Sequence, residues 1–338
     1  MAKYTRRGSD QLDAQIDVQL RHVAELAAPH SIAGILLGGY GRGEGTPFIN
    51  PDGTQSPFND YDLVVIVEQL NRDVRQLFKT LEQQLTAELG IPVDLCPYEK
   101  SLLSRCECSL LNYEMKHGHK VIWGDEHILD AMPDYPAGKL PLSEGSRLLL
   151  NRGKLLLDIK QRVAEAEPLT DDERIRFIKF IQKAWLAMGD CALLAKGKYD
   201  LSYGVKRERI ATLQDIPDRD AIVDHYVESI QLKEKGDYLA RLPGTDIAAE
   251  FQFVCSLYLS FFHWYQALHT GRECSMIKAM LLNLKWNGRP LLHHPRKYLY
   301  SAIQELLKEE PGEFRLREML FCRSNFVERF YAMQKRFS

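Results

Sequence analysis

The chain lacks the long apolar run that a membrane-spanning helix needs. Its 338 residues contain no stretch of about 18 consecutive apolar residues. The first residues, 1–7, also lack the apolar core of a secretory signal peptide. We therefore expect a soluble, cytoplasmic protein that has no membrane partner.

Two further absences narrow the class of function. The seven cysteines include no Cys-x-x-Cys pair, so free thiols in a reducing compartment are expected rather than a zinc site. The formal net charge is -2, which argues against a protein that grips nucleic acid along an extended surface. Whether the protein forms an oligomer stays open.

What the chain does contain is a glycine-rich run directly after a short apolar segment. Residues 32–37 are typical of a buried strand, and the run that follows includes Gly38, Gly39, Gly41 and Gly43. Glycines let the backbone turn sharply and approach a ligand closely, and exposed amides in such a turn favour phosphate oxygens. Arg42 adds a charge that can fork onto a phosphate. Alone the run is a weak signal, because it lacks the Lys-Ser/Thr ending of a P-loop and the spacing of a dinucleotide fingerprint.

Two aspartates lie at the start of the next apolar segment, one just before it and one within it. Residues 61–67 are β-branched and apolar and predict a buried strand. Side chains alternate along a strand, so Asp60 and Asp62 point the same way. Two adjacent carboxylates repel each other, and a divalent cation such as Mg²⁺ relieves that repulsion. The alternative is a turn aspartate followed by a solvated one, but the glycine run upstream favours the metal site.

A third carboxylate is expected on a neighbouring strand. A helical pattern over residues 74–89 ends at Gly90. Residues 91–97 then read as a short strand in which Asp94 is the one charged residue. A buried charge needs a partner or a metal, although a strand-end aspartate facing water is the alternative.

Together these motifs resemble the DNA polymerase β-type nucleotidyltransferase superfamily. The family pattern is a Gly-Gly or Gly-Ser pair, an Asp-x-Asp on a strand, and a third acidic residue on a later strand. The variant Gly-Gly-Tyr-Gly-Arg-Gly-Glu is most similar to the glycine loop of bacterial protein PII uridylyltransferases. The resemblance covers roughly residues 30–125, and residues 110–125 look like the helix and last strand that close many of these domains.

The resemblance implies transfer of a nucleoside monophosphate from a nucleoside triphosphate to an acceptor hydroxyl, with release of pyrophosphate. ATP is the favoured donor, Mg²⁺ the expected metal and Mn²⁺ its alternative. The implied catalytic residues and metal ligands are Asp60, Asp62 and Asp94. The implied nucleotide-binding residues are Gly38, Gly39, Tyr40, Gly41, Arg42 and Gly43, where Tyr40 replaces the Ser of many members.

The acceptor and the nucleotide base cannot be inferred from the chain. Residues 46–58 are an insertion before Asp60, and its Pro51-Asp52-Gly53 turn signal predicts a surface hairpin. Two alternatives to a metabolic transferase stay open. One is a non-catalytic regulatory module that binds nucleotide or a protein partner. The other is a toxin- or antitoxin-type transferase that acts on RNA or protein.

The predicted fold class is α+β. We expect a nucleotidyltransferase domain with a small mixed sheet over residues 1–131, a linker rich in Pro and Gly over 132–141, and a helical bundle over 142–338. By analogy, the bundle would supply the acceptor side. Expected helices lie at 9–28, 146–163, 218–234, 247–268, 297–309 and 313–336, with a further helix opened by a Thr170–Glu173 capping box. The basic, aromatic segment 196–209 either holds an anion or forms a solvated surface, and charge runs favour the latter.

Overall fold

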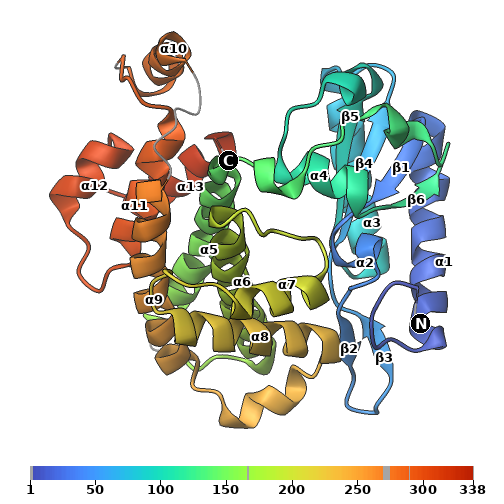
Figure 1. Cartoon of the computed structure of the whole chain (residues 1–338), viewed down its shortest axis with the longest axis horizontal. Coiled ribbons are helices and arrows are strands. Elements are labelled where there is room, and N and C mark those ends of the chain that lie inside the picture. Colours follow the sequence, from blue (N-terminus) through green and yellow to red (C-terminus); the bar gives the residue numbers. More distant parts are fainter. Residues whose placement is uncertain (1–2, 166, 269–274, 289, 338) are drawn as a thin grey trace. The chain divides into compact units, whose positions relative to one another are not determined.

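The computed structural model of the chain describes residues 3–165, 167–268, 275–288 and 290–337 (Figure 1). The fold is mixed α+β, with a small mixed sheet near the N-terminus and helices through most of the remaining chain. Two compact units are present. The first consists of Met1–Leu140, Gly197–Arg209 and Ile230–Arg241, and the second of Pro141–Lys196, Ile210–Ser229 and Leu242–Ser338. Two segments that the sequence grouped with the helical half therefore belong to the first unit, while the assignment of functions to domains stays a prediction.

The sheet of the first unit has the strand order β5-β4-β1-β6. Its strands are β1 (Ala33–Leu36), β4 (Tyr61–Val67), β5 (Val93–Glu99) and β6 (Lys120–Trp123). β1 pairs antiparallel with β4 and β6, whereas β4 and β5 run parallel. A parallel pair needs a crossover connection, which α3 (Arg72–Leu89) supplies. The strands predicted from the sequence are present, with ends shifted by one or two residues.

Each face of the sheet has its own apolar core. One core joins alternate residues of β4 to α1 (Asp10–Ala27) and α3, and it buries the predicted stripe of Leu12, Ile16, Leu20 and Val23. The other core lies beneath α4 (Leu110–His117) and contains Val64 and Ile66 of β4. Because side chains alternate along β4, neighbouring residues of this strand face different environments.

The insertion before Asp60 forms the predicted hairpin, with strands β2 (Pro47–Ile49) and β3 (Gln55–Pro57). Gly53 in its turn has φ +82°, a conformation that favours glycine. Beyond β3, the Phe58 ring stacks on Phe48 at 5.1 Å and lies 4.6 Å from the Tyr238 ring. The hairpin is thus anchored to the later segment of the first unit.

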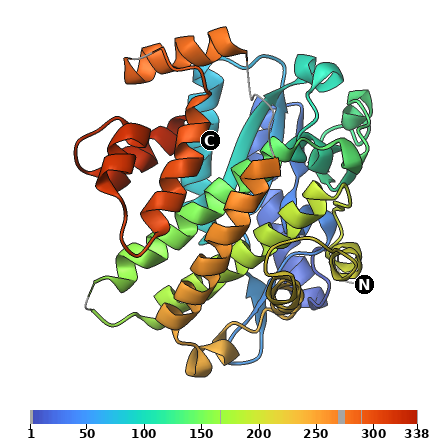
Figure 2. The same cartoon turned by 60° about the vertical axis from the view of Figure 1, so that its left-hand side comes forward.

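The second unit is helical, and its long helices pack side by side (Figure 2). α9 (Ile247–Leu268) contacts α5 (Leu142–Val163), α6 (Asp171–Ala195) and α11 (Pro295–Leu307), as expected for a central helix. The capping box of Thr170 and Glu173 opens α6 as predicted. The helix expected at 218–234 is α8 (Arg219–Lys235). Among the described residues, three helices were not predicted: α2 (Gly38–Arg42), α7 (Tyr203–Ala211) and α10 (Met276–Asn287).

The single helix predicted over 313–336 is wrong. The structure has two helices there, α12 (Glu313–Leu320) and α13 (Phe326–Phe337). In the segment between the two helices, Phe321 and Asn325 have φ values of +54° and +55°. The left-handed backbone at Phe321 ends α12. The apolar pattern continues across the break, so periodicity could not reveal it.

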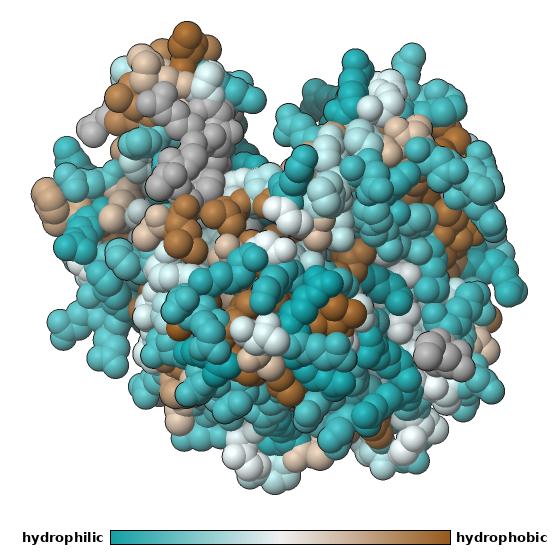
Figure 3. Space-filling model, in the orientation of Figure 1, coloured by the Kyte–Doolittle hydropathy of each residue, from teal (hydrophilic) through white to brown (hydrophobic). Residues whose placement is uncertain are grey.

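One helix of the second unit exposes a row of apolar side chains. Ile277, Leu281 and Leu284 follow helical spacing on α10 and are 71%, 62% and 53% exposed. Figure 3 shows brown residues at this helix, at the upper left among paler and teal ones. Among the helices of the described residues, none is both long and apolar enough to cross a membrane.

Candidate active site

The three predicted carboxylates meet where β4 and β5 begin. Asp60 precedes β4 and Asp62 is its second residue, so both side chains point to one face. The parallel register pairs Asp62 with Asp94 of β5, which places Asp94 on that same face. Carboxylate oxygens from all three residues lie within 4.8 Å of one another. The expected proximity of Asp94 to the pair is confirmed, while its role as a ligand stays a prediction.

The donor set fits a hard divalent cation. Oxygens bound to one octahedral Mg²⁺ at ~2.1 Å lie about 3.0 Å apart when adjacent and about 4.2 Å apart when opposite, so the carboxylates would move closer together on binding the cation. Asp60 and Asp62 are half-buried and Asp94 is exposed, and partial burial strengthens the repulsion among the carboxylates. Their influence extends to Glu82 of α3, whose pKa is raised by burial and further by the charge of Asp94.

The glycine run forms a short helix, α2, instead of the sharp turn that the sequence predicted. The Leu37 amide donates to the Asp62 carbonyl at 2.8 Å, and the Gly41 amide donates to the Leu37 carbonyl at 3.0 Å. Gly38 has φ +64°, and a Cβ atom there would lie 2.7 Å from Asp62 Oδ2. Position 38 therefore favours glycine, because its backbone is left-handed and a side chain would also displace the Asp62 carboxylate. The first amides of a helix have no intrahelical acceptor, and here they lie beside the carboxylate cluster.

Tyr40 of this helix has a structural role that the sequence did not reveal. Its side chain is buried, and its hydroxyl accepts hydrogen bonds from the amides of Phe58 at 3.0 Å and Asn59 at 3.2 Å. Burial raises the pKa of the Tyr40 hydroxyl to about 12, so it stays neutral. Tyr40 thus fixes the backbone immediately before Asp60. Its predicted contact with nucleotide stays a prediction, but its hydroxyl already has protein partners.

Arg42, at the other end of α2, lies among carboxylates. Its guanidinium is 3.1 Å from Glu114 and 3.9 Å from Glu44, and its side chain is 10% exposed. Burial lowers the pKa of Arg42, but the charges around it, that of Glu114 foremost, hold the pKa above its ordinary value. Glu44 also accepts hydrogen bonds from Arg6 and from the Tyr203 amide. A phosphate contact by Arg42 would therefore compete with these ion pairs.

The basic, aromatic segment is packed into the first unit. Lys206 is 2% exposed and Tyr199 3% exposed, so the interpretation as a solvated surface is wrong for these residues. The Lys206 ammonium lies 4.4 Å from the Tyr199 ring centroid and 5.1 Å from that of Tyr203, a cation–π arrangement. Arg209 pairs with Asp200 at 3.1 Å. The interleaved tyrosines were the sequence signal that the cations are packed against rings.

Comparison with known proteins adds little to this description. No protein-family model matches the chain, and no curated protein matches it. Among solved structures, the chain is similar to a crystal structure of a mutant of the toxin-antitoxin MntA-HpeT. That match has a TM-score of 0.23 and 19% identity, and it covers 34% of this chain and 77% of the other. A likeness this weak carries no argument, so the interpretation of the site depends on its own residues.

Proposed function

We propose that this protein is a metal-dependent nucleotidyltransferase, which moves a nucleoside monophosphate from a nucleoside triphosphate to an acceptor hydroxyl. The observation that carries the proposal is the cluster of Asp60, Asp62 and Asp94, with oxygens within 4.8 Å of one another. Three carboxylates that converge on one point form the kind of oxygen ligand set that a hard divalent cation such as Mg²⁺ prefers. The resemblance in the sequence supports the same reaction class.

The glycine segment supports a triphosphate beside that cluster. Gly38 leaves no room for a side chain next to Asp62, so only backbone lies between the carboxylates and the start of α2. The first amides of α2, which have no acceptor within the helix, can donate to phosphate oxygens. This arrangement would hold the β- and γ-phosphates while the α-phosphorus lies at the carboxylates.

The proposed reaction is a single displacement at the α-phosphorus. The acceptor oxygen forms a bond to this phosphorus, the bond to the bridging oxygen breaks, and pyrophosphate leaves. Asp60, Asp62 and Asp94 would hold Mg²⁺ or Mn²⁺, which when bound neutralises phosphate charge and lowers the pKa of the acceptor hydroxyl. Asp94 is the most exposed of the three, so we assign it the hydroxyl proton. Tyr40 positions Asp60 through the backbone of Phe58 and Asn59.

The direct test is turnover of labelled nucleotides. Purified protein is incubated with Mg²⁺ and each nucleoside triphosphate in turn, labelled either at the α- or at the γ-phosphate. Separate reactions receive fractions of small molecules, RNA or protein as acceptors. We expect label to enter product from the α-position only, with an equal amount of pyrophosphate. Chelation of the metal, or the Asp60→Asn variant, should abolish it.

The outcomes also separate the alternatives. Binding of a triphosphate without pyrophosphate release, with every acceptor fraction, would overturn the transferase proposal and leave a non-catalytic nucleotide-binding module. Label that enters only the RNA or only the protein fraction would identify a macromolecular acceptor, as the toxin- or antitoxin-type alternative requires. Label transferred from the γ-position would indicate a different reaction class and would also overturn the proposal.

A further inference from the structure

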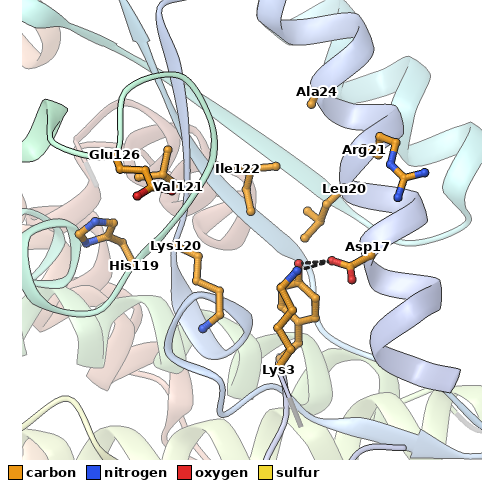
Figure 4. Close-up of a pocket in the computed structure, with 11 residues that line it drawn as sticks. Lys3, Asp17, Leu20, Arg21, Ala24, His119, Lys120, Val121, Ile122 and Glu126 are labelled. Carbon is orange, nitrogen blue, oxygen red and sulfur yellow. Dashed lines mark hydrogen bonds and ion pairs between the residues drawn. The ribbon is translucent and has the colours of Figure 1, made fainter. Parts of the chain in front are cut away.

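The first unit has a hollow between α1 and β6, apart from the carboxylate cluster, with a volume of about 670 Å³. Figure 4 shows Ile122 of β6 opposite Leu20 of α1, with Lys3 and Lys120 below them. The residues of the hollow that carry charge are Lys3, Asp17, Arg21, Lys120 and Glu126. The proposed transferase reaction assigns no role to any of them.

This hollow lies on the opposite face of the sheet from the carboxylate cluster. Lys120 pairs with Leu36 of β1, and Leu36 pairs with Leu63 of β4. Paired residues point to the same face, and Leu63 is the neighbour of Asp62 along β4, so their side chains point to opposite faces. The core clusters agree, since Leu36 and Leu63 belong to the core beneath α1. A ligand in the hollow would thus be separated from the proposed metal site by the sheet itself.

The charges of the hollow leave an excess of cations. Lys3 is bonded to Asp17 at 2.7 Å, which neutralises both groups. Lys120 donates to the Gly41 carbonyl at 2.9 Å and forms no ion pair with any residue that the structure describes. Burial lowers the pKa of Lys120 and the charge of Lys3 lowers it further, while Asp13 raises it. An anion beside Lys120 would relieve both unfavourable effects.

The remainder of the wall is apolar. Leu20 is buried behind it, and the partly exposed Ala24 and Ile122 form the apolar surface next to the cations. A hollow with an apolar wall and a few polar groups is typical of a small-molecule site. The volume exceeds what an isolated inorganic anion requires.

We propose that this hollow binds a small phosphate monoester, with its phosphate at Lys120, its apolar or aromatic part against Ala24 and Ile122, and Arg21 as a further cation at the rim. The proposal is independent of the proposed transferase activity. It predicts a binding site that persists when the metal site is disabled.

Calorimetric titration with AMP and with inorganic phosphate, both in EDTA, tests the proposal. We expect AMP to bind the wild-type protein more tightly than phosphate does, because only AMP fills the apolar part. The Lys120→Gln variant should lose about tenfold in AMP affinity, since a charge-assisted hydrogen bond is removed. Asp62→Asn should bind AMP as the wild type does.

Lys116→Gln is the matched control. Lys116 also donates to backbone carbonyls, those of Leu129 and Asp130, but it does not line the hollow. This variant should keep wild-type affinity. Because Lys120 also holds Gly41, its replacement could unfold the protein, and Arg21→Gln on the surface of α1 then serves as the second variant, with an expected loss of about threefold.

Three results would overturn the proposal. The first is the absence of AMP binding to the wild-type protein in EDTA. The second is an equal loss of affinity in the Lys120 or Arg21 variant and in Lys116→Gln, which would mean non-specific attraction. The third is a change of affinity in Asp62→Asn, with none in the Lys120 and Arg21 variants, which would place the phosphate at the carboxylate cluster.

Discussion

The two ends of α2 differ in the charges around them: carboxylates gather at one end, and ion pairs form at the other. At its first residue, Gly38, three carboxylates of like sign lie together. At its last residue, Arg42, cations and carboxylates alternate, because Arg42 lies between Glu44 and Glu114 and Glu44 also binds Arg6. The five residues of α2 thus lie between a cluster of carboxylates and a network of ion pairs.

We assign the carboxylate cluster to function and the ion-pair network to the stability of the fold. Carboxylates held close together repel one another, and a divalent cation bound there, as we propose, would reduce that repulsion. Paired charges need no ligand, and breaking a buried pair leaves an uncompensated charge. Replacing residues at the two ends should therefore have opposite effects on stability.

The largest effect is expected at the like-charged end. Asp62→Asn should reduce transfer at least about a hundredfold, because loss of a metal ligand removes several kcal/mol of transition-state stabilisation. The melting temperature without metal should stay unchanged or rise, since one repulsive charge is removed. Turnover and thermal unfolding of the same preparation measure both. A variant with near wild-type turnover in Mg²⁺ would contradict the metal site.

At the paired end, the expected effect is on stability. Glu44→Gln should lower the free energy of unfolding by about 2 kcal/mol, because two guanidinium groups lose their shared carboxylate and Arg6 is partly exposed. Urea unfolding at neutral pH gives this value. If Glu44→Gln unfolds like the wild type, the network at this end is not structural.

Arg42→Ala provides the control for this prediction. Calorimetry with ATP and Mg²⁺ separates its predicted phosphate contact from its ion pairs with Glu44 and Glu114. Unchanged ATP affinity with reduced stability would make Arg42 a structural residue.

The smallest effect concerns a paired charge in the second unit and depends on pH. The hydrogen bond from Arg162 lowers the pKa of Glu173 to about 2, from an ordinary value of 4.5. A lowered pKa stabilises the folded state above pH 4.5, and this contribution is lost as the pH falls from 4.5 towards 2. The stability difference between wild type and Glu173→Gln should therefore be largest above pH 4.5 and disappear near pH 2. Urea midpoints at several pH values test this, and a pH-independent difference would contradict it.

Local sequence was sufficient for several features. Alternation along β4 placed Asp60 and Asp62 on one face, because the geometry of a strand leaves no other choice. The capping box at Thr170 and the helix end at Gly90 were predicted for the same reason, since the groups that satisfy the free backbone atoms are close in sequence. The apolar stripe of α1 likewise marked the side that is buried.

Contacts between distant segments needed the tertiary structure. Asp94 meets Asp62 because β4 and β5 pair in parallel register, and no local pattern specifies a register across a helix of 18 residues. Arg42 pairs with Glu114, and the Tyr40 hydroxyl accepts from the amides of Phe58 and Asn59. The sequence around Arg42 and Tyr40 does not show these partners, and it suggested contacts with a ligand instead. Lys206 lies against the rings of Tyr199 and Tyr203; the tyrosines were visible in the sequence, but the burial of the lysine between them was not.

The sequence by itself determined which chemical groups are present and which of them share a strand or helix, because these depend on backbone periodicity. The tertiary structure alone decided which charges are neutralised and which are left together. Electrostatic energy depends on distance in space and on burial, and both arise only when segments far apart in the chain pack against each other.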